Sequence, residues 1–297
     1  MILGIDIGGT RIKTGVIDNE KLINKKNFRT PTKFEEFITQ LKEIIEDYLN
    51  ITSFTQIAFS VPGSVDKSGT ILHGGAVSYL NDVNLKNLIY SWGIGDNWEV
   101  FVENDAKAAT LGEMTLGNLS QIKNGAALIL GTGVGMGLCL NNKLYKGIRN
   151  QAGEVSFWIR DRSISDVESF VGIGLSAVKL ITLLAKYLEV ENDGPTVFKV
   201  LHNTNNRKAE QLFSRYCEEV ASVCFNLQTI LDLDKIVIGG GISQQALLID
   251  KIQEAYQKIF TTAPVIQETL QPILIEAAKF KADANLIGAA QGGFIDK

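Results

Sequence analysis

Two aspartates of this chain stand at the ends of apolar runs, beside small residues. Asp6 lies in ILGIDIGGT, one residue before a Gly-Gly-Thr turn, and Asp105 follows VFVEN and opens an alanine-rich segment. A Gly-Thr turn exposes backbone N–H groups and a hydroxyl, which together can bind an anion such as a phosphate. Next to phosphates, Asp6 would hold Mg²⁺ directly or through water. The alternative is that Asp6 caps backbone groups of the turn.

The segment FVENDAKAAT allows two roles for Asp105. An aspartate that opens a helix ordinarily caps the helix N-terminus. At the edge of a substrate site, the same carboxylate would be a general base that takes a proton from a hydroxyl nucleophile, with Asn104 bound to the same substrate. Glu154 and Glu168 are further carboxylates beside apolar residues, although such glutamates are ordinarily solvated.

The first Gly-Thr turn has a counterpart later in the chain. Shifted by 122 positions, GTRIKTGVIDNEKL (9–22) aligns without a gap on GTGVGMGLCLNNKL (131–144), and six of the fourteen positions are identical. The second copy has Leu128 where the first has Asp6. A third glycine cluster, GGGIS, follows the strand pattern KIVI, and none of the three matches the P-loop pattern. We therefore expect two related lobes that share a shape and divide the chemistry.

Alternating strands and helices must position these residues. Apolar residues at spacings of three and four predict an amphipathic helix over 33–49. Short apolar runs predict strands at QIAFSVPG, WEVFVEN, GAALIL, KIVIG and PILIEAA. Further helical patterns cover about 168–190, 209–231 and 244–260, and ADANLIGAAQGGFI predicts a closing helix. The alternation indicates an α/β fold.

The composition argues against several classes of protein. The chain has 297 residues, of which 45% are hydrophobic and 21% charged, which suits one large or two modest soluble domains. The net charge is −4 and no run of lysine and arginine occurs, so nucleic-acid binding is not expected. The three cysteines form no CxxC pair, which is usual in a reducing compartment.

Neither a leader peptide nor a membrane span is expected. Met1 runs directly into the first strand pattern, with no basic segment before it. The most apolar stretch, VGIGLSAVKLITLLAKYL, contains Lys179 and Lys186 and has helical periodicity, which predicts a core helix. We therefore expect a cytoplasmic globular protein.

The motifs, taken in order, resemble a known family. DIGGTRIK, VENDA, LGTGVG, AGE and GGGIS look like the ROK family of sugar kinases, within the actin/hexokinase/Hsp70 ATPase superfamily. The resemblance runs from Ile2 to the final Gly-Ala-rich helix. It implies two RNase H-like lobes with an interlobe cleft that closes on ATP, the two Gly-Thr turns facing each other across the phosphates. We accordingly expect an N-terminal lobe over 1–106, with a closing helix at about 282–297, and a C-terminal lobe over 107–281.

The resemblance also implies roles for individual residues. Asp105 is the implied base for the phosphorylated hydroxyl, and the implied sugar-binding residues are Asn104, Asp105, Glu154 and Glu168. The implied nucleotide-binding residues are Asp6, Gly8, Gly9, Thr10, Lys13, Gly131, Thr132, Gly133, Gly135, Gly239, Gly240 and Gly241. Within that set, Asp6 is the implied Mg²⁺ contact and the last three glycines lie near the adenosine.

One departure from the ROK pattern concerns zinc. ROK kinases usually bind a structural zinc through one histidine and three cysteines. Here Phe157 stands at the histidine position, and the cysteine positions hold Ile159, Asp161 and Asp166. Structural zinc requires a set of N and S donors, so no zinc is expected. We expect Phe157, Trp158 and Phe170 to pack and hold this loop instead.

The expected function is ATP- and Mg²⁺-dependent phosphorylation of a sugar hydroxyl. By likeness to zinc-free variants, the acceptor is O6 of glucose or of a β-glucoside, and N-acetylmannosamine and fructose are alternatives. A non-catalytic sensor of ATP and sugar is an alternative of another class, although the presence of both Asp6 and Asp105 argues for turnover.

Two further classes fit the sequence less well. A ROK repressor would need a DNA-binding segment before Gly8, and an Hsp70- or actin-like ATPase module would leave VENDA unexplained. By family likeness, we expect the chain to form a homodimer that acts on a small-molecule sugar.

Overall fold

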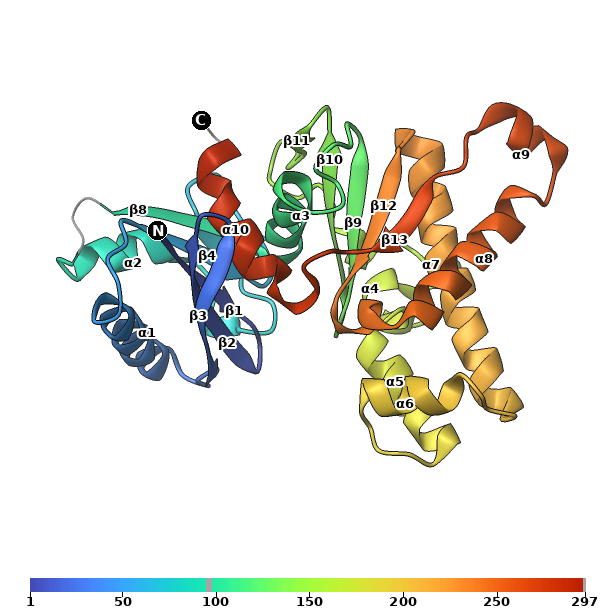
Figure 1. Ribbon diagram of the computed structural model, residues 1–297, viewed down its shortest axis with the longest axis horizontal. Helices are drawn as coiled ribbons and strands as arrows, with labels where there is room; N and C mark the ends of the chain where they lie inside the picture. The colour runs from blue at the N-terminus through green and yellow to red at the C-terminus, as the bar shows by residue number, and fades with distance from the viewer. Residues whose placement is uncertain (95–97, 296–297) are drawn as a thin grey trace. The chain divides into compact units, whose positions relative to one another are not determined.

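The computed structural model of the chain describes residues 1–94 and 98–295 (Figure 1). Its contacts divide the chain into two compact units. Unit 1 comprises Met1–Ser120, Lys143–Ala152 and the chain from Asp283, and unit 2 comprises Gln121–Asn142 and Gly153–Ala282. The lobe boundary expected between residues 106 and 107 falls within a helix of unit 1, and the expected lobes stay a prediction.

Unit 1 contains a large sheet, a small sheet and the helices that cover them. The large sheet has strands β1 (Ile2–Ile7), β2 (Arg11–Asp18), β3 (Lys21–Arg29), β4 (Gln56–Val61) and β8 (Glu99–Asn104). The small sheet has strands β5 (Ser64–Val65), β6 (Thr70–His73) and β7 (Val83–Asn84). The helices are α1 (Phe34–Leu49), η1 (Ser78–Leu80), α2 (Leu85–Ser91), α3 (Asp105–Thr115) and α10 (Ala284–Ile295).

The large sheet of unit 1 has the strand order β3-β2-β1-β4-β8. Strands β1, β4 and β8 are parallel, so their carboxyl ends lie at one edge, whereas β2 and β3 run antiparallel beside β1. The register sets Asp6 beside Ser60 and Val61 beside Asn104. This register brings two of the sequence motifs to the same edge of the sheet.

Residues of β1 belong to two apolar clusters, one on each face of that sheet, because successive strand residues face opposite sides. Leu3 and Ile5 belong to the apolar cluster that Phe37 of α1 completes. Ile2 belongs to a second cluster, which contains Ala108 of α3 and Ala289 of α10. The amphipathic helix predicted over 33–49 is confirmed as α1, which covers one face, while α3 and α10 cover the other.

Helices α3 and α10 approach each other closely at a glycine. A Cβ atom on Gly288 would lie 1.6 Å from the carbonyl oxygen of Ala108, so no larger residue fits there without a shift of backbone. Alanines and glycines on both helices let the two backbones approach this closely, whereas larger side chains at the contact would keep them further apart. The closing helix predicted from the sequence thus packs directly on the helix that begins at Asp105.

Unit 2 contains the second large sheet and most of the helices. Its strands are β9 (Gly125–Leu130), β10 (Val134–Leu140), β12 (Lys235–Gly239) and β13 (Leu274–Ala277), and the chain passes back to unit 1 through β11 (Lys143–Leu144). Its helices are η2 (Val155–Phe157), η3 (Val167–Ser169), α4 (Val171–Gly174), α5 (Ala177–Leu188), α6 (Gly194–Leu201), α7 (Arg207–Leu231), η4 (Gly241–Gln244), α8 (Ala246–Phe260) and α9 (Pro264–Thr269). The turn η5 (Lys281–Asp283) leads into α10.

The two large sheets have the same topology. The second has the order β11-β10-β9-β12-β13, with β9, β12 and β13 parallel, which repeats the order of the first. The turns that end β2 and β10 also match, because Asn19, Glu20, Asn141 and Asn142 all have a left-handed backbone, with φ between 45° and 68°. The internal repeat seen in the sequence is therefore confirmed as a structural repeat, and the α/β fold class is confirmed with it.

The apolar stretch predicted as one core helix is broken in two. Helix α4 ends at Gly174 and α5 begins at Ala177, with Ser176 capping α5 by accepting a hydrogen bond from the Lys179 amide. Val171–Leu188 is the one stretch of the described residues whose length and hydropathy would suit a membrane span. In the structure, 44% of it is buried, and Leu184 lies in the core of unit 2.

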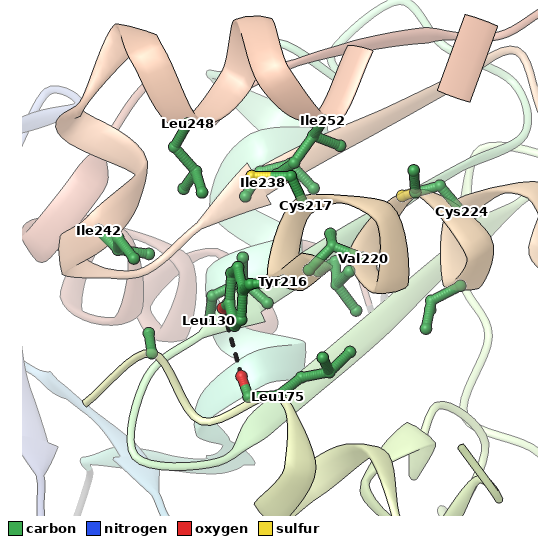
Figure 2. Close-up of a cluster of buried hydrophobic side chains, with 14 of the residues drawn as sticks. Leu130, Leu175, Tyr216, Cys217, Val220, Cys224, Ile238, Ile242, Leu248 and Ile252 are labelled. Atoms are coloured by element: carbon green, nitrogen blue, oxygen red, sulfur yellow. Dashed lines mark hydrogen bonds between the residues drawn. The ribbon is translucent and has the colours of Figure 1, made fainter. Parts of the chain in front are cut away.

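Helix α7 supplies much of the core of unit 2, as Figure 2 shows. Tyr216, Cys217, Val220 and Cys224 pack there against residues of β12, η4 and α8. Burial raises the pKa of the Cys217 and Cys224 thiols to about 12, so both stay protonated and unreactive near neutral pH. Both cysteines are free, as is the buried Cys139.

The loop expected to be held by three aromatic residues differs from the prediction. Phe157 is 72% exposed, so the prediction is wrong for this residue. Trp158 packs against the core of unit 2, and Phe170 is half-buried beside Ile159, with which it forms an isolated β-bridge. Backbone pairing and polar side chains, described below, hold most of this loop.

Candidate functional site

The carboxyl edge of the first sheet collects most of the predicted site residues of unit 1. Strand β1 leads into the Gly8–Thr10 turn and β8 leads into Asp105, with β4 between them. Carboxyl ends of parallel strands are where ligands bind in open α/β sheets, because side chains and helix N-termini meet there. Asp6 and Asp105, distant in the sequence, thus lie at the ends of strands separated by a single strand.

Asp6 is a buried carboxylate, 5% exposed, with several hydrogen-bond donors. Its Oδ1 accepts from Ser60 Oγ at 2.8 Å and from Asn285 Nδ2 at 3.0 Å, and its Oδ2 pairs with Lys13 Nζ at 3.3 Å. Such donors offset the cost of removing a charge from water. Within the described part of the chain no donor to Asp6 belongs to the Gly-Gly-Thr turn, so the structure does not favour the turn-capping alternative.

Ser60 and Asn285 were missed by sequence reasoning. Ser60 is a buried polar residue within the apolar strand QIAFSV, and that exception to the pattern was the available signal. Asn285 is on α10, and nothing in its local sequence points to a residue 279 positions earlier. Both are positioning residues for the Asp6 carboxylate.

The first Gly-Thr turn is closed by its own backbone and by Thr30. Gly8 donates its amide to the Arg11 carbonyl at 2.9 Å, and Thr30 Oγ1 donates to the Gly8 carbonyl at 2.6 Å. Across residues 1–94 and 98–295, the amides of Gly9 and Thr10 donate to no protein acceptor. The turn therefore presents two backbone donors that an anion can accept from.

Asn104, and not Asp105, is the N-cap of α3. The Oδ1 atom of Asn104 accepts from the Lys107 amide at 3.1 Å, while its Nδ2 donates to the Gly63 carbonyl at 2.7 Å and to Asp105 Oδ1 at 2.9 Å. Asp105 Oδ1 also accepts from the Ala106 amide at 2.7 Å. Asn104 thus performs the capping that the sequence allowed for Asp105, and it orients the Asp105 carboxylate.

These contacts bear on both predicted roles. Asp105 lies in the first turn of α3, where the helix dipole favours a negative charge. Asn104 is buried and both ends of its amide bind protein atoms, so the structure gives it a positioning role, and its sugar contact stays a prediction.

Lys107 is a third residue that sequence reasoning missed. It is buried on α3, and its Nζ donates to the Asn150 carbonyl at 2.7 Å. Asn150 in turn donates from Nδ2 to the Val65 carbonyl at 3.2 Å. A lysine within an alanine-rich helix was the signal, since lysine is almost never fully buried without a partner. The contact fastens the Lys143–Ala152 segment beside the first turn of α3.

In unit 2, two glycine clusters lie on neighbouring strand ends. The Gly131–Gly133 turn follows β9, and the Gly239–Gly241 cluster follows its parallel neighbour β12. Gly240 has a φ of 89°, and a Cβ atom there would lie 2.0 Å from the Leu130 carbonyl oxygen, so only glycine fits. The structure thus joins these two predicted nucleotide-binding segments, whereas Gly135 lies within β10.

The second Gly-Thr turn is fixed by backbone bonds. Gly131 donates its amide to the Gly133 carbonyl at 2.9 Å, and the Gly131 carbonyl accepts from the amides of Ala177 and Val178 at the start of α5. In the described ranges, the amides of Thr132 and Gly133 donate to no protein acceptor. This turn therefore offers backbone donors as the first does.

The two predicted sugar-binding glutamates lie on different turns of unit 2. Glu154 is half-buried and precedes η2, a turn that Ser156 attaches to β10 by donating from Oγ to the Val134 carbonyl at 2.6 Å. The Glu168 side chain is 62% exposed and pairs with Lys179 Nζ at 2.7 Å. This hydrogen bond, with the charge of Lys179, lowers the pKa of Glu168.

A comparison with known protein families matches nearly the whole chain. The family model described as ROK family matches residues 2–162 and 182–291. This chain belongs to the ROK family. The stretch 163–181, between the two matched segments, contains Glu168 and Lys179.

Several proteins similar to this chain are sugar kinases by name. The chain is 27% identical to a beta-glucoside kinase of Listeria monocytogenes, over 97% of this chain and 95% of that protein. It is 28% identical to an N-acetylmannosamine kinase of Haemophilus influenzae, over 97% and 93%. The crystal structure of a ROK hexokinase from Thermus thermophilus superposes with a TM-score of 0.77 at 25% identity, covering 98% of this chain and 96% of that one.

The residues at the first Gly-Thr turn fit a magnesium ion that binds together with a nucleotide. Mg²⁺ usually takes one or two carboxylates from the protein, with phosphate oxygens and waters completing its shell. Asp6 supplies one buried carboxylate on the strand that leads into the turn with the open amides. Among the described residues, no group of three histidine, cysteine, aspartate or glutamate side chains forms a site of its own.

A cavity of about 490 Å³ lies elsewhere in unit 2 of this ROK chain. Its lining includes Trp158, Arg160, Asp161, Arg215 and Glu219, and no residue predicted to bind nucleotide or sugar. The cavity is therefore distinct from the candidate site, although it adjoins the loop that carries Glu168.

Proposed function

We propose that this ROK-family chain is an ATP-dependent sugar kinase that phosphorylates a hexose or hexoside, with O6 of glucose or of a β-glucoside as the acceptor. The observation that carries the proposal is the oriented Asp105 carboxylate, at the same sheet edge as Asp6 and a turn with open amide donors. The named kinases among its relatives support the same activity.

Asp105 acts as general base in the proposed reaction. Its carboxylate accepts the proton of the sugar hydroxyl as the hydroxyl oxygen forms a bond to the γ-phosphorus of ATP. The bond from that phosphorus to the bridging oxygen breaks, and ADP leaves. Phosphoryl transfer depends mainly on positioning and on stabilisation of charge, so a fixed carboxylate contributes both by orienting the hydroxyl and by accepting its proton.

The two Gly-Thr turns bind the nucleotide in this proposal. Their open amides, at Gly9 and Thr10 in unit 1 and at Thr132 and Gly133 in unit 2, donate to phosphate oxygens. Asp6 would hold a Mg²⁺ ion, which would neutralise charge on the phosphates. Ser60 and Asn285 hold the Asp6 carboxylate in place. The Gly239–Gly241 cluster lies near the adenosine.

The identity of the sugar is the finer part of the proposal. A β-glucoside kinase and an N-acetylmannosamine kinase are similar to this chain to nearly the same degree, 27% and 28%. The zinc-free loop favours glucose or a β-glucoside, and N-acetylmannosamine and fructose are the alternatives. We further propose a cytoplasmic homodimer and no zinc ion.

The test is ATP consumption by the purified protein with a panel of sugars. The panel contains glucose, N-acetylmannosamine, fructose, mannose, cellobiose and an aryl β-glucoside, with a reaction lacking sugar as the blank. We expect sugar-dependent ADP release with glucose or a β-glucoside as the best acceptor. Binding of ATP without ADP release for any sugar would contradict the kinase and favour a sensor.

A further inference from the structure

The segment from Trp158 to Val171 forms a small hairpin in unit 2. The Val171 amide donates to the Trp158 carbonyl at 2.9 Å, and the Arg160 amide donates to the Ser169 carbonyl at 2.8 Å. The second arm carries Glu168 and belongs to the 163–181 stretch that the family model leaves unmatched. The hairpin therefore joins a matched arm, with Arg160, to an unmatched arm, with Glu168.

We propose that Arg160 is a positioning residue that fastens this hairpin to helix α7 and thereby fixes Glu168 for sugar binding. The inference rests on the proposed function for the role of Glu168, and on the contacts of unit 2 for the attachment itself. It gives the hairpin a polar anchor where the ROK pattern has zinc ligands.

The guanidinium of Arg160 contacts both the opposite arm of the hairpin and helix α7. Its Nη1 donates to the Glu168 carbonyl at 2.7 Å, across the hairpin. Its Nε donates to Glu219 Oε2, and its Nη2 donates to Glu219 Oε1 at 3.4 Å, on α7. This two-point contact uses the fork geometry that only arginine offers a carboxylate. One side chain thus ties the arm bearing Glu168 to a 25-residue core helix.

Gly174 provides the space through which Arg160 reaches these partners. A Cβ atom on Gly174 would lie 2.5 Å from Arg160 Nη1 and 2.5 Å from the Glu168 carbonyl oxygen. Since contacts under 3 Å do not occur for real Cβ atoms, a larger residue would displace the guanidinium. The end of α4 is therefore shaped around the Arg160 contact.

Burial separates Arg160 from the other arginines nearby. The side chains of Arg160 and Glu219 are each 22% exposed, whereas that of Arg215 is 73% exposed. Arg215 Nε donates to Glu219 Oε1 at 3.0 Å. Hydrogen bonds from Ser163 lower the pKa of Asp161, and the charges of Arg160 and Arg215 lower it further. These charges at the cavity are mutually compensated, which is the pattern of a structural attachment.

A second contact from α7 explains why loss of Arg160 should weaken sugar binding and leave the use of ATP unchanged. Tyr216 Oη donates to the Leu175 carbonyl at 3.2 Å, at the joint between α4 and α5 (Figure 2). The start of α5 binds the Gly131 carbonyl of the second Gly-Thr turn. Loss of Arg160 would therefore free the hairpin while Tyr216 still holds the joint and the nucleotide turn. The predicted result is weaker sugar binding with unchanged use of ATP.

The test compares Arg160→Ala and Arg160→Lys with the wild type and with Arg162→Ala, a matched control on the same hairpin. Lysine keeps the charge but cannot form the fork, so it tests geometry if the alanine variant folds poorly. We expect both Arg160 variants to raise the KM for the sugar about 10- to 100-fold. The KM for ATP should stay within about twofold, and Arg162→Ala should match the wild type. A sugar KM within twofold of wild type in both Arg160 variants would overturn the proposal.

A double variant and amide exchange test the attachment separately from the proposed function. Glu219→Gln should raise the sugar KM as Arg160→Ala does, and the double variant should be no worse than either single variant. Hydrogen exchange should be faster at the amides of residues 158–171 in the Arg160 variants, and unchanged exchange would contradict the attachment. If the wild type phosphorylates no sugar, the proposed function fails, while the exchange comparison still decides the attachment.

Discussion

The two Gly-Thr hairpins of this chain share a topology and differ in chemistry. In unit 1, Asp6 on β1 lies beside Ser60 on β4, and both belong to a polar network. In unit 2, the equivalent strands place Leu128 beside Ile238, and both are fully buried in the apolar core. One hairpin thus keeps a charge at the position where the other keeps a leucine.

The loops of the two hairpins also differ by one residue. In unit 1, Ile7 pairs with Ile12 and four residues lie between them, whereas in unit 2, Leu130 pairs with Val134 and three lie between them. The gapless sequence alignment hides this shift in register. The difference teaches that a repeated turn keeps its amide donors, while the neighbouring strands decide whether a buried carboxylate lies beside it.

The largest expected effect tests whether unit 1 carries the chemistry. Asp105→Asn keeps an oxygen acceptor for the donors from Asn104 and Ala106 but removes the base. We expect kcat to fall about 10²- to 10⁴-fold, because general base catalysis contributes that much. Steady-state kinetics with the best sugar provide the measurement. An ATP analogue should bind the variant as tightly as the wild type, and a kcat above a tenth of wild type would argue against Asp105 as base.

The second prediction introduces a carboxylate into the hairpin of unit 2, at the position equivalent to Asp6. Leu128→Asp would place a carboxylate opposite Ile238, with none of the donors that surround Asp6. An unpaired buried charge costs about 3–5 kcal/mol, so the free energy of unfolding should fall by roughly this amount. Urea denaturation followed by circular dichroism measures it, with Leu128→Met as the size-matched control. A loss below about 1 kcal/mol would show that the second hairpin tolerates a charge.

The third prediction removes one donor from the network around Asp6. Asn285→Ala deletes the bond from α10 to Asp6 Oδ1, and a hydrogen bond to a charged group contributes about 1.5–3 kcal/mol. We expect the KM for Mg·ATP to rise about tenfold or more, with the sugar KM changed little. Ser60→Ala is the companion variant, since Ser60 donates to the same oxygen. A larger change in the sugar KM than in the Mg·ATP KM would contradict the assignment.

The smallest effect concerns the exposed pair of Glu168 and Lys179 in unit 2. The hydrogen bond and charge of Lys179 lower the pKa of Glu168 in the folded state. The pair therefore stabilises the fold above the ordinary glutamate pKa, and this contribution is lost as the pH falls through the lowered value. Lys179→Gln should raise the Glu168 pKa, as measured by carbon NMR of the side-chain carboxyl. The melting temperatures of variant and wild type should converge in acid.

Sequence patterns predicted the elements that depend on local spacing. The sequence predicted helices α1 and α7 and the two Gly-Thr turns, because helix faces and turn residues are encoded by residues close together in the chain. The turn residues Asn19 and Asn141 aligned for the same reason, and they are left-handed in both copies.

Features that depend on partners distant in the chain could not be predicted from the sequence. Asn285 contacts Asp6 across most of the chain, and the short strands of the small sheet have no periodic pattern of their own. The break after Gly174 was missed because the surrounding residues are apolar throughout, so hydropathy continues across it. Phe157 was predicted to pack, but an aromatic residue reveals nothing by itself about which side of a loop it occupies.

The close packing of α10 on α3 has a consequence for the order of events during synthesis. The strands of unit 1 leave the ribosome first, but the helix with Gly288 and Asn285 follows all of unit 2 in the chain. Until that helix docks, the apolar face containing Ile2 and Ala108 lacks its cover, and Asp6 lacks a donor. A nascent chain therefore completes the hydrogen-bond network around Asp6 only after the second Gly-Thr hairpin has been made.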